Sequence, residues 1–229
     1  MQSEIKKEEK KEEKKEEKKE ITVFMTYIEG IIEKYTRDNA HLIFGEIMAY
    51  IRKYCGLDDE YYITGSYVMG LNNIKEISNI SVSVSLKNMS LILKSIEKFG
   101  KLEQIKSDEK GVIPKFTLDL TQFFTHNKKY RDLRNNFFIE IFQNSIESGF
   151  PNENFSFKTM KESGGITKDI FDNYYMSLNK LLQWKKELVK LNKDADKHIK
   201  DIDDITKAMK IKYFKYKNKY LKLKNQKIF

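Results

Sequence analysis

The stretch from Ile80 to Leu86 constrains the fold of this chain most strongly, because apolar residues and serines alternate along it without interruption. Successive side chains of a β-strand point to opposite faces, so this alternation predicts a strand with one apolar and one polar face. The polar face carries Ser81, Ser83 and Ser85, and it also fits the solvent-exposed side of an edge strand. In either case the chain must build a β-sheet whose apolar face is covered by other elements.

Further helices and strands surround this segment. Helical spacing of apolar residues runs from Ile21 to about Cys55 as two helices, and another helix is expected over Asn88–Phe99 with Asn88 as its N-cap. A further helix is expected from about Asp172, followed by a last long helix. The other strands are expected at Tyr61–Thr64, Leu102–Ile105, Lys115–Leu120 and Phe137–Phe142. This order predicts a sheet domain of the α+β or α/β class. We assign it to the α+β class, with a small mixed sheet flanked by N-terminal and C-terminal helices.

The composition fits a globular domain in a reducing compartment. Of 229 residues 40% are apolar and 34% are charged, which is enough apolar material for a core. The single cysteine, Cys55, excludes an intramolecular disulfide framework, and we interpret it as a buried structural thiol rather than a nucleophile. No apolar run approaches the roughly 20 residues that a membrane span needs, and the N-terminus is charged where a signal peptide would be apolar. We therefore expect an intracellular protein without a transmembrane segment.

One motif suggests chemistry. The strand at Tyr61–Thr64 ends in Gly65-Ser66 before a helix, and the next strand opens with Ser78, Asn79 and, two residues on, Ser81. A glycine followed by serine at a helix start lets a phosphate approach the backbone closely. Strand residues at i and i+2 share a face, so Asn79 and Ser81 present their side chains together. An ordinary strand-to-helix turn would also explain the Gly-Ser pair.

This arrangement resembles the start of the DNA polymerase beta-like nucleotidyltransferase fold, where a strand ends in Gly-Ser and the next strand opens with Ser-Asp-x-Asp. The resemblance implies that Gly65 and Ser66 form a pocket for nucleotide phosphates. In the family the two aspartates and a third carboxylate hold two Mg²⁺ ions that align an in-line attack on a phosphate.

The metal ligands of this pattern are missing here. Asn79 and Ser81 stand where the two aspartates would be, and both are neutral. Asp119 matches the third carboxylate, although it can equally be a surface or capping residue, and Glu140 is a weaker candidate for the same place. We therefore predict no intact catalytic residue, no metal site and no cofactor. Magnesium is expected as a cofactor only if other carboxylates take the place of the missing aspartate ligands.

The resemblance extends beyond the sheet. The segment Leu181–Lys186, which contains Trp184, and the segment His198–Ile202 look like the helices that follow the catalytic sheet in small nucleotidyltransferases. The segment Lys212–Lys224 is similar to a C-terminal signature of giant-virus proteins. The chain is accordingly identified as a degenerate giant-virus member of this fold, which implies the host cytoplasm, a viral factory or the virion as its location. Trp184 is more simply a core anchor, and Lys185 and Lys186 are more simply solvated.

The positive charge is concentrated at the C-terminus. Residues 205–229 contain nine lysines and no acidic residue, and removing these from the 43 basic residues leaves 34, equal to the 34 acidic ones. Lysines beside aromatic rings suit nucleic acid, but also a viral protein partner, self-association or an anionic membrane surface. The predicted binding residues are Lys212, Tyr213, Lys215, Tyr216, Lys217, Lys219, Tyr220, Lys222 and Lys224.

Five segments are expected along the chain. They are a disordered Lys/Glu repeat over 1–20, a helical pair over 21–58, a nucleotidyltransferase-like sheet domain over 59–150, a helical part packed on it over 151–205, and the basic helical tail over 206–229. The leading hypothesis is a catalytically inactive binding or scaffold module. An active nucleotidyltransferase with a rebuilt carboxylate site and a structural virion or assembly protein remain as alternatives.

Overall fold

The computed structural model describes residues 19, 22–36, 39–77, 79–107, 111–126, 137–143, 155–190 and 195–226. Side chains at 105–107, 111–113, 126 and 224–226 are not described. The Lys/Glu repeat over 1–20, except Lys19, therefore lies outside the described residues, as do Ser78 and the side chain of Lys224.

Helices and strands are mixed along the chain. A helix over residues 22–34 precedes the labelled elements. The other helices are α2 (Ala40–Cys55), α3 (Ser66–Leu71), α4 (Leu86–Ile96), η2 (Glu97–Phe99), α5 (Thr121–His126), α6 (Phe157–Glu162), α7 (Leu178–Lys190) and α8 (Ala195–Gln226). The strands are β1 (Tyr61–Thr64), β2 (Asn79–Val84), β3 (Lys101–Ser107), β4 (Gly111–Asp119), β5 (Phe138–Gln143), β6 (Ile166–Lys168) and β7 (Tyr174–Met176).

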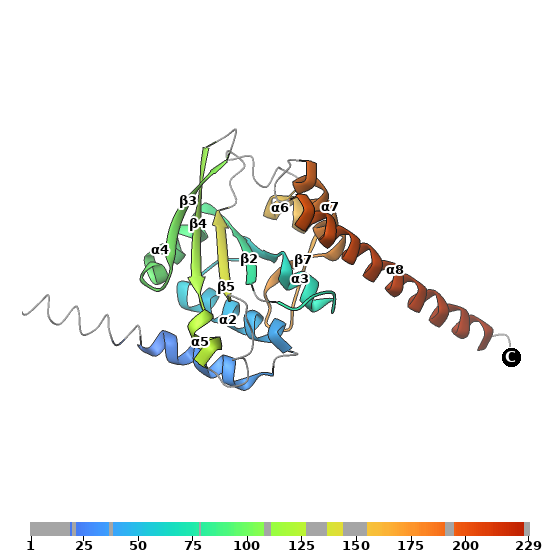
Figure 1. Cartoon of the computed structure of the whole chain (residues 1–229), viewed down its shortest axis with the longest axis horizontal. Helices are drawn as coiled ribbons and strands as arrows, with labels where there is room; N and C mark the ends of the chain where they lie inside the picture. Colours follow the sequence, from blue (N-terminus) through green and yellow to red (C-terminus); the bar gives the residue numbers. More distant parts are fainter. Residues whose placement is uncertain are drawn as a thin grey trace, which may run out of the picture.

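The strands form one mixed sheet in the order β3-β4-β5-β2-β1-β7-β6. The β2–β5 and β1–β7 pairs are parallel, and the other pairs are antiparallel. Helices flank this sheet at both ends of the chain (Figure 1). The prediction of an α+β fold with a mixed sheet between N-terminal and C-terminal helices is confirmed.

Two hydrophobic clusters pack on the sheet. The larger cluster joins the helix over 22–34, α2 and α4 to the apolar residues of β1, β2, β4 and β5. The smaller cluster joins α3, α6, β7, α7 and α8. Tyr61 and Ile63 belong to the larger cluster and Tyr62 to the smaller one, because neighbouring residues of β1 point to opposite faces. The sheet thus separates the two halves of the core.

Strands β6 and β7 were not expected from the sequence. The region from Asp172 was predicted to be helical, but Tyr175 lies in β7 and α7 starts only at Leu178. Each of these strands has three residues, which is too short for an alternating pattern to be recognised. Strand β7 pairs with β1 and β6 pairs with β7, which extends the sheet on one side.

The start of α4 also differs from the prediction. Ser85 is its N-cap, because the Ser85 side chain accepts a hydrogen bond from the backbone N–H of Asn88. The Asn88 side chain is buried and contacts the backbone of Asp58 and Glu60 instead. Leu86, which was assigned to the strand, opens the helix and is 63% exposed.

The interpretation of β2 as an edge strand is wrong. Strand β2 lies between β5 and β1 in the interior of the sheet, and Ser83 is buried. Ser81 and Ser85 are half-buried, and the environment of Ser81 depends on the neighbouring strands.

The last helix, α8, has 32 residues and extends away from the sheet (Figure 1). Its first half packs on α7, with Ile205 fully buried. Ile199 is 53% exposed, and the buried positions beside it are His198 and Asp201. No helix in the described part of the chain is both long and apolar enough to cross a membrane.

Candidate functional site

The turn between β1 and α3 holds the predicted phosphate-binding residues. Gly65 has φ +69° and ψ −134°, a backbone conformation that L-residues rarely adopt. Ser66 opens α3, and its hydroxyl donates a hydrogen bond to the backbone carbonyl of Asn79. The Asn79 Oδ1 atom lies 3.3 Å from the same hydroxyl. The Ser66 hydroxyl thus ties α3 to the start of β2.

The β1–β2 pairing brings the second half of the motif to the same place. Thr64 lies opposite Ser81 in the antiparallel register. A Cβ atom built on Gly65 would lie 3.6 Å from Ser81 Oγ, which is an ordinary contact distance. Glycine is therefore required at this turn by its backbone conformation and not by lack of space. Gly65, Ser66, Asn79 and Ser81 lie together, as the motif spacing predicts.

Of the two predicted carboxylates, Glu140 lies next to the motif strand. Strand β5 runs parallel to β2, with Glu140 opposite Ser81. Thr117 on β4 lies opposite Glu140 in turn, so one row crosses four strands through Thr64, Ser81, Glu140 and Thr117. The Thr117 hydroxyl in this row is buried and has no hydrogen-bond partner among the described residues.

Asp119 lies farther from the motif than Glu140. It is opposite Phe138 of β5, and Phe138 in turn is opposite Asn79, so one whole strand separates Asp119 from β2. At the usual strand spacing this places the two backbones about 10 Å apart. Asp119 is exposed, and its Oδ1 accepts a hydrogen bond of 2.8 Å from the backbone N–H of Thr121. This is the geometry of a residue that caps the start of α5.

A lysine neutralises Glu140. Lys115 Nζ lies 3.3 Å from Glu140 Oε1 and 3.1 Å from Glu103 Oε2. Burial lowers the pKa of Lys115, but the hydrogen bond that Lys115 donates to Glu103 and the charge of Glu140 outweigh it, and the pKa is raised. Lys115 therefore stays protonated, and its ammonium group sits beside the carboxylate nearest Ser81.

The residues at this face do not fit a two-magnesium site. Mg²⁺ requires near-octahedral oxygen ligands and is usually held by carboxylates. Asn79 and Ser81 supply only neutral oxygens, and Glu140 is paired with Lys115. Across the described residues, no cluster of three or more His, Cys, Asp or Glu side chains is arranged to hold a metal ion. We derive no step through a metal at this site.

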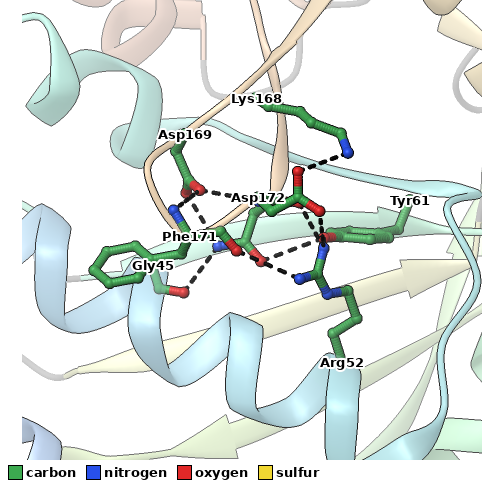
Figure 2. A network of polar contacts seen from close by, with 8 residues as sticks. Gly45, Arg52, Tyr61, Lys168, Asp169, Phe171 and Asp172 are labelled. Atoms are coloured by element: carbon green, nitrogen blue, oxygen red, sulfur yellow. Dashed lines mark hydrogen bonds and ion pairs between the residues drawn. The ribbon is translucent and has the colours of Figure 1, made fainter.

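A second polar cluster, not predicted from the sequence, anchors the β6–β7 hairpin to α2 (Figure 2). Arg52 of α2 donates to the backbone carbonyls of Asp172 and Phe171, at 2.5 and 3.4 Å, and to Tyr61 Oη at 3.2 Å. Burial raises the pKa of Tyr61 to about 12, although Arg52 acts against it, so this hydroxyl stays protonated and donates to Asn173.

Asp169 is the acceptor at the centre of this cluster. Its Oδ2 accepts hydrogen bonds from Tyr67 Oη at 2.5 Å and from Asn173 Nδ2 at 3.0 Å. Its Oδ1 accepts from the backbone N–H groups of Phe171 and Asn173. Asn173 Nδ2 also donates to the carbonyl of Gly45, which joins the hairpin to the middle of α2. The polar groups of this cluster satisfy each other's hydrogen bonds. We therefore assign the cluster a structural role, which is to hold the β6–β7 hairpin on α2.

A third cluster joins α7 to α8. Lys185 is buried, contrary to the expectation that it is solvated, and its Nζ lies 2.7 Å from Asp201 Oδ2 and 3.2 Å from His198 Nδ1. Lys75 reaches the other oxygen of Asp201 at 3.3 Å. Trp184 packs edge-on against Phe155 at 4.8 Å between ring centroids, as expected of a core anchor. The sequence segments that resemble the helical part of nucleotidyltransferases therefore meet at a buried ion pair.

Cys55 takes no part in these clusters. Burial raises the pKa of its thiol to about 12, so the thiolate that a nucleophile requires does not form near neutral pH. This agrees with its interpretation as a structural residue.

Comparisons with known proteins give limited information. No protein-family model matches the chain, and no curated protein matches it. Among solved structures, the crystal structure of the Megavirus polyadenylate synthase is similar, with a TM-score of 0.39 and 13% sequence identity. The similar region covers 83% of this chain but 36% of that enzyme, so the chain spans about a third of its length. A likeness at this level carries no argument about activity, and the functional argument depends on the residues themselves.

Proposed function

We propose that this chain is a catalytically inactive nucleotidyltransferase-like protein of a large DNA virus, which acts as a binding or scaffold module. Its basic tail is the element that we assign to a polyanionic or protein partner. The host cytoplasm, a viral factory or the virion is the expected location.

One observation carries the proposal. The two strand positions that face the Gly65-Ser66 turn are Asn79 and Ser81, and the carboxylate beside them, Glu140, is paired with Lys115. The chemistry of the family requires anionic ligands at these positions to hold metal ions. Here the two motif positions are neutral and the one carboxylate beside them is held by an ammonium group, which favours binding without phosphoryl transfer.

The Gly65-Ser66 turn supports a vestigial pocket rather than a working one. In a working site the backbone and hydroxyl at a helix start receive the nucleotide phosphates. The Ser66 hydroxyl instead donates to the carbonyl of Asn79. A nucleotide would have to displace this internal hydrogen bond, so we expect weak or no nucleotide binding at this turn.

The active-enzyme alternative requires Glu140 and Asp119 to act together. Asp119 is separated from the motif strand by β5 and caps α5, and Glu140 would have to leave Lys115. These contacts disfavour a rebuilt metal site. The alternative of a structural virion or assembly protein differs from the proposal only in what the tail and the sheet domain contact.

Magnesium-dependent incorporation of labelled nucleotides into RNA tests the proposal. We expect the wild-type chain to be inert. The revertant Asn79→Asp/Ser81→Asp supplies the missing carboxylates, and activity in this variant supports the assignment to the nucleotidyltransferase fold. Incorporation by the wild type that Glu140→Gln abolishes would overturn the proposal, because it would place a working metal ligand at Glu140.

A further inference from the structure

We infer that the distal half of α8, residues 211–223, binds single-stranded nucleic acid. This inference rests on the proposed function, because it names the ligand of the tail that the proposal assigns to a polyanion or protein. It depends on three properties of this helix, which are an uncovered face, an unbalanced charge and a row of exposed aromatic rings.

One side of α8 packs on the rest of the protein in the first half of the helix, and the same side is exposed in the second half. His198, Asp201 and Ile205 are buried at spacings of three and four, which places them on one side of α8. The same spacing leads through Met209 to Lys212, whose Nζ donates to Asn72 Oδ1 at 2.6 Å. Beyond this contact every described residue of α8 is exposed, as the helix leaves the domain (Figure 1). One continuous helical face is therefore half covered and half open.

The open half of this face is aromatic. Tyr216 and Tyr220 continue the spacing, and Tyr213 lies beside them, with exposed fractions of 70%, 65% and 62%. Three tyrosines at spacings of three and four form a row along about 10 Å of helix. The exposed rings are broad enough to stack on bases, which stabilises single-stranded nucleic acid without sequence preference.

Lysines lie on both sides of this row. Lys212 and Lys219 lie on one side of the tyrosines and Lys217 on the other, by helical geometry. Residues 205–229 contain no acidic residue, and from Lys210 to Lys222 none of the lysines forms an ion pair within the described part of the chain. Ammonium groups on both sides of a row of rings suit a strand whose phosphates flank its bases.

Other occupants fit this surface less well. A second copy of the helix would bring lysine rows against each other, and like charges at a helix pair destabilise it. A membrane-surface helix needs a wide apolar face, but Lys217 lies between the tyrosine row and a second apolar strip with Phe214 and Leu221. Duplex nucleic acid offers phosphates but keeps its bases stacked inside, so the tyrosine rings would have no exposed base to stack on.

Fluorescence anisotropy of the full chain with a labelled single-stranded oligouridylate, over a series of NaCl concentrations, tests the inference. We expect the wild type to prefer this strand to a duplex of equal length. Tyr213→Ala/Tyr216→Ala/Tyr220→Ala should weaken binding about fivefold or more for each base that loses its ring, with the salt slope unchanged. Lys212→Gln/Lys217→Gln/Lys219→Gln should reduce the magnitude of the slope of log affinity against log salt by about two.

The matched control removes three exposed lysines outside the tail, in Lys186→Gln/Lys197→Gln/Lys200→Gln. We expect this control to bind as the wild type does. If it loses as much affinity as the tail variants, or if the wild type shows only salt-resistant self-association or equal binding to anionic vesicles, the inference is wrong. Nucleotide incorporation by the wild type would overturn the proposed function while leaving this inference intact, so the two failures are distinguishable.

Discussion

Lys115 Nζ lies 3.3 Å from Glu140 Oε1, on the sheet face that also carries Ser81. The contact places a fixed positive charge beside the carboxylate nearest the motif strand. In a metal-dependent nucleotidyltransferase, Mg²⁺ ions would occupy this face. The ammonium group of Lys115 supplies a counter-charge for this carboxylate without a metal ion.

The buried pair between α7 and α8 should be essential for stability. Among the described residues, Lys185→Met leaves the buried Asp201 with only the half-exposed Lys75 as a partner, and breaking such a pair costs about 3–5 kcal/mol. The neighbouring Lys186 is exposed, so Lys186→Met should change stability by less than about 0.5 kcal/mol. Urea denaturation of both variants measures the difference. Equal effects of the two substitutions would show that the ion pair contributes nothing.

The same pair predicts a dependence on pH. Burial alone raises the pKa of Asp201, but the hydrogen bond and charge of Lys185, with the charge of Lys75, outweigh it and lower the pKa below its ordinary value of 3.8. A carboxylate with a lowered folded pKa stabilises the protein above its unfolded pKa, and this contribution disappears as the pH falls through the folded pKa. The difference in unfolding free energy between the wild type and Asp201→Asn should therefore be constant near neutral pH and shrink below about pH 4. A constant difference down to pH 3 would contradict this assignment.

Two glycines in neighbouring helices should respond to alanine in opposite directions. A Cβ atom at Gly45 would lie 2.6 Å from Tyr67 Oη and 2.7 Å from the Phe171 ring, inside the polar cluster of Figure 2. Gly45→Ala should therefore destabilise the fold by about 1–3 kcal/mol through overpacking. At Gly30 a Cβ atom meets nothing within 4 Å, so Gly30→Ala should stabilise the helix over 22–34 by about 0.5–1 kcal/mol. Thermal unfolding measures both, and stabilisation by Gly45→Ala would mean that the cluster is loosely packed.

Local patterns predicted the elements that carry a clear period. The strand at Tyr61–Thr64 was predicted with the bounds that the structure shows, and the alternation from Ile80 placed β2 within two residues. The motif spacing also brought Gly65 and Ser66 beside Asn79 and Ser81. These features depend on neighbours in the sequence, which is why the sequence contains the information for them.

Features that depend on distant segments were not predictable in the same way. The sequence favoured Asp119 over Glu140 as the third carboxylate. The distance of each residue from Ser81 depends on the register of β5 against β2 and β4, which places Glu140 nearer. The burial of Lys185 depends on Asp201, a residue of another helix. Strands β6 and β7 are too short to have a period, and the turn between them is held by hydrogen bonds to α2.

The central claim is that the face around Ser81 no longer holds metal ions. Calorimetric titration with Mn²⁺, in the presence and absence of ATP, measures this directly. We expect no saturable binding to the wild type, and binding to Asn79→Asp/Ser81→Asp/Lys115→Met, in which three carboxylates face each other without the ammonium group. Saturable binding of Mn²⁺ to the wild type that is lost in Glu140→Gln would contradict the account.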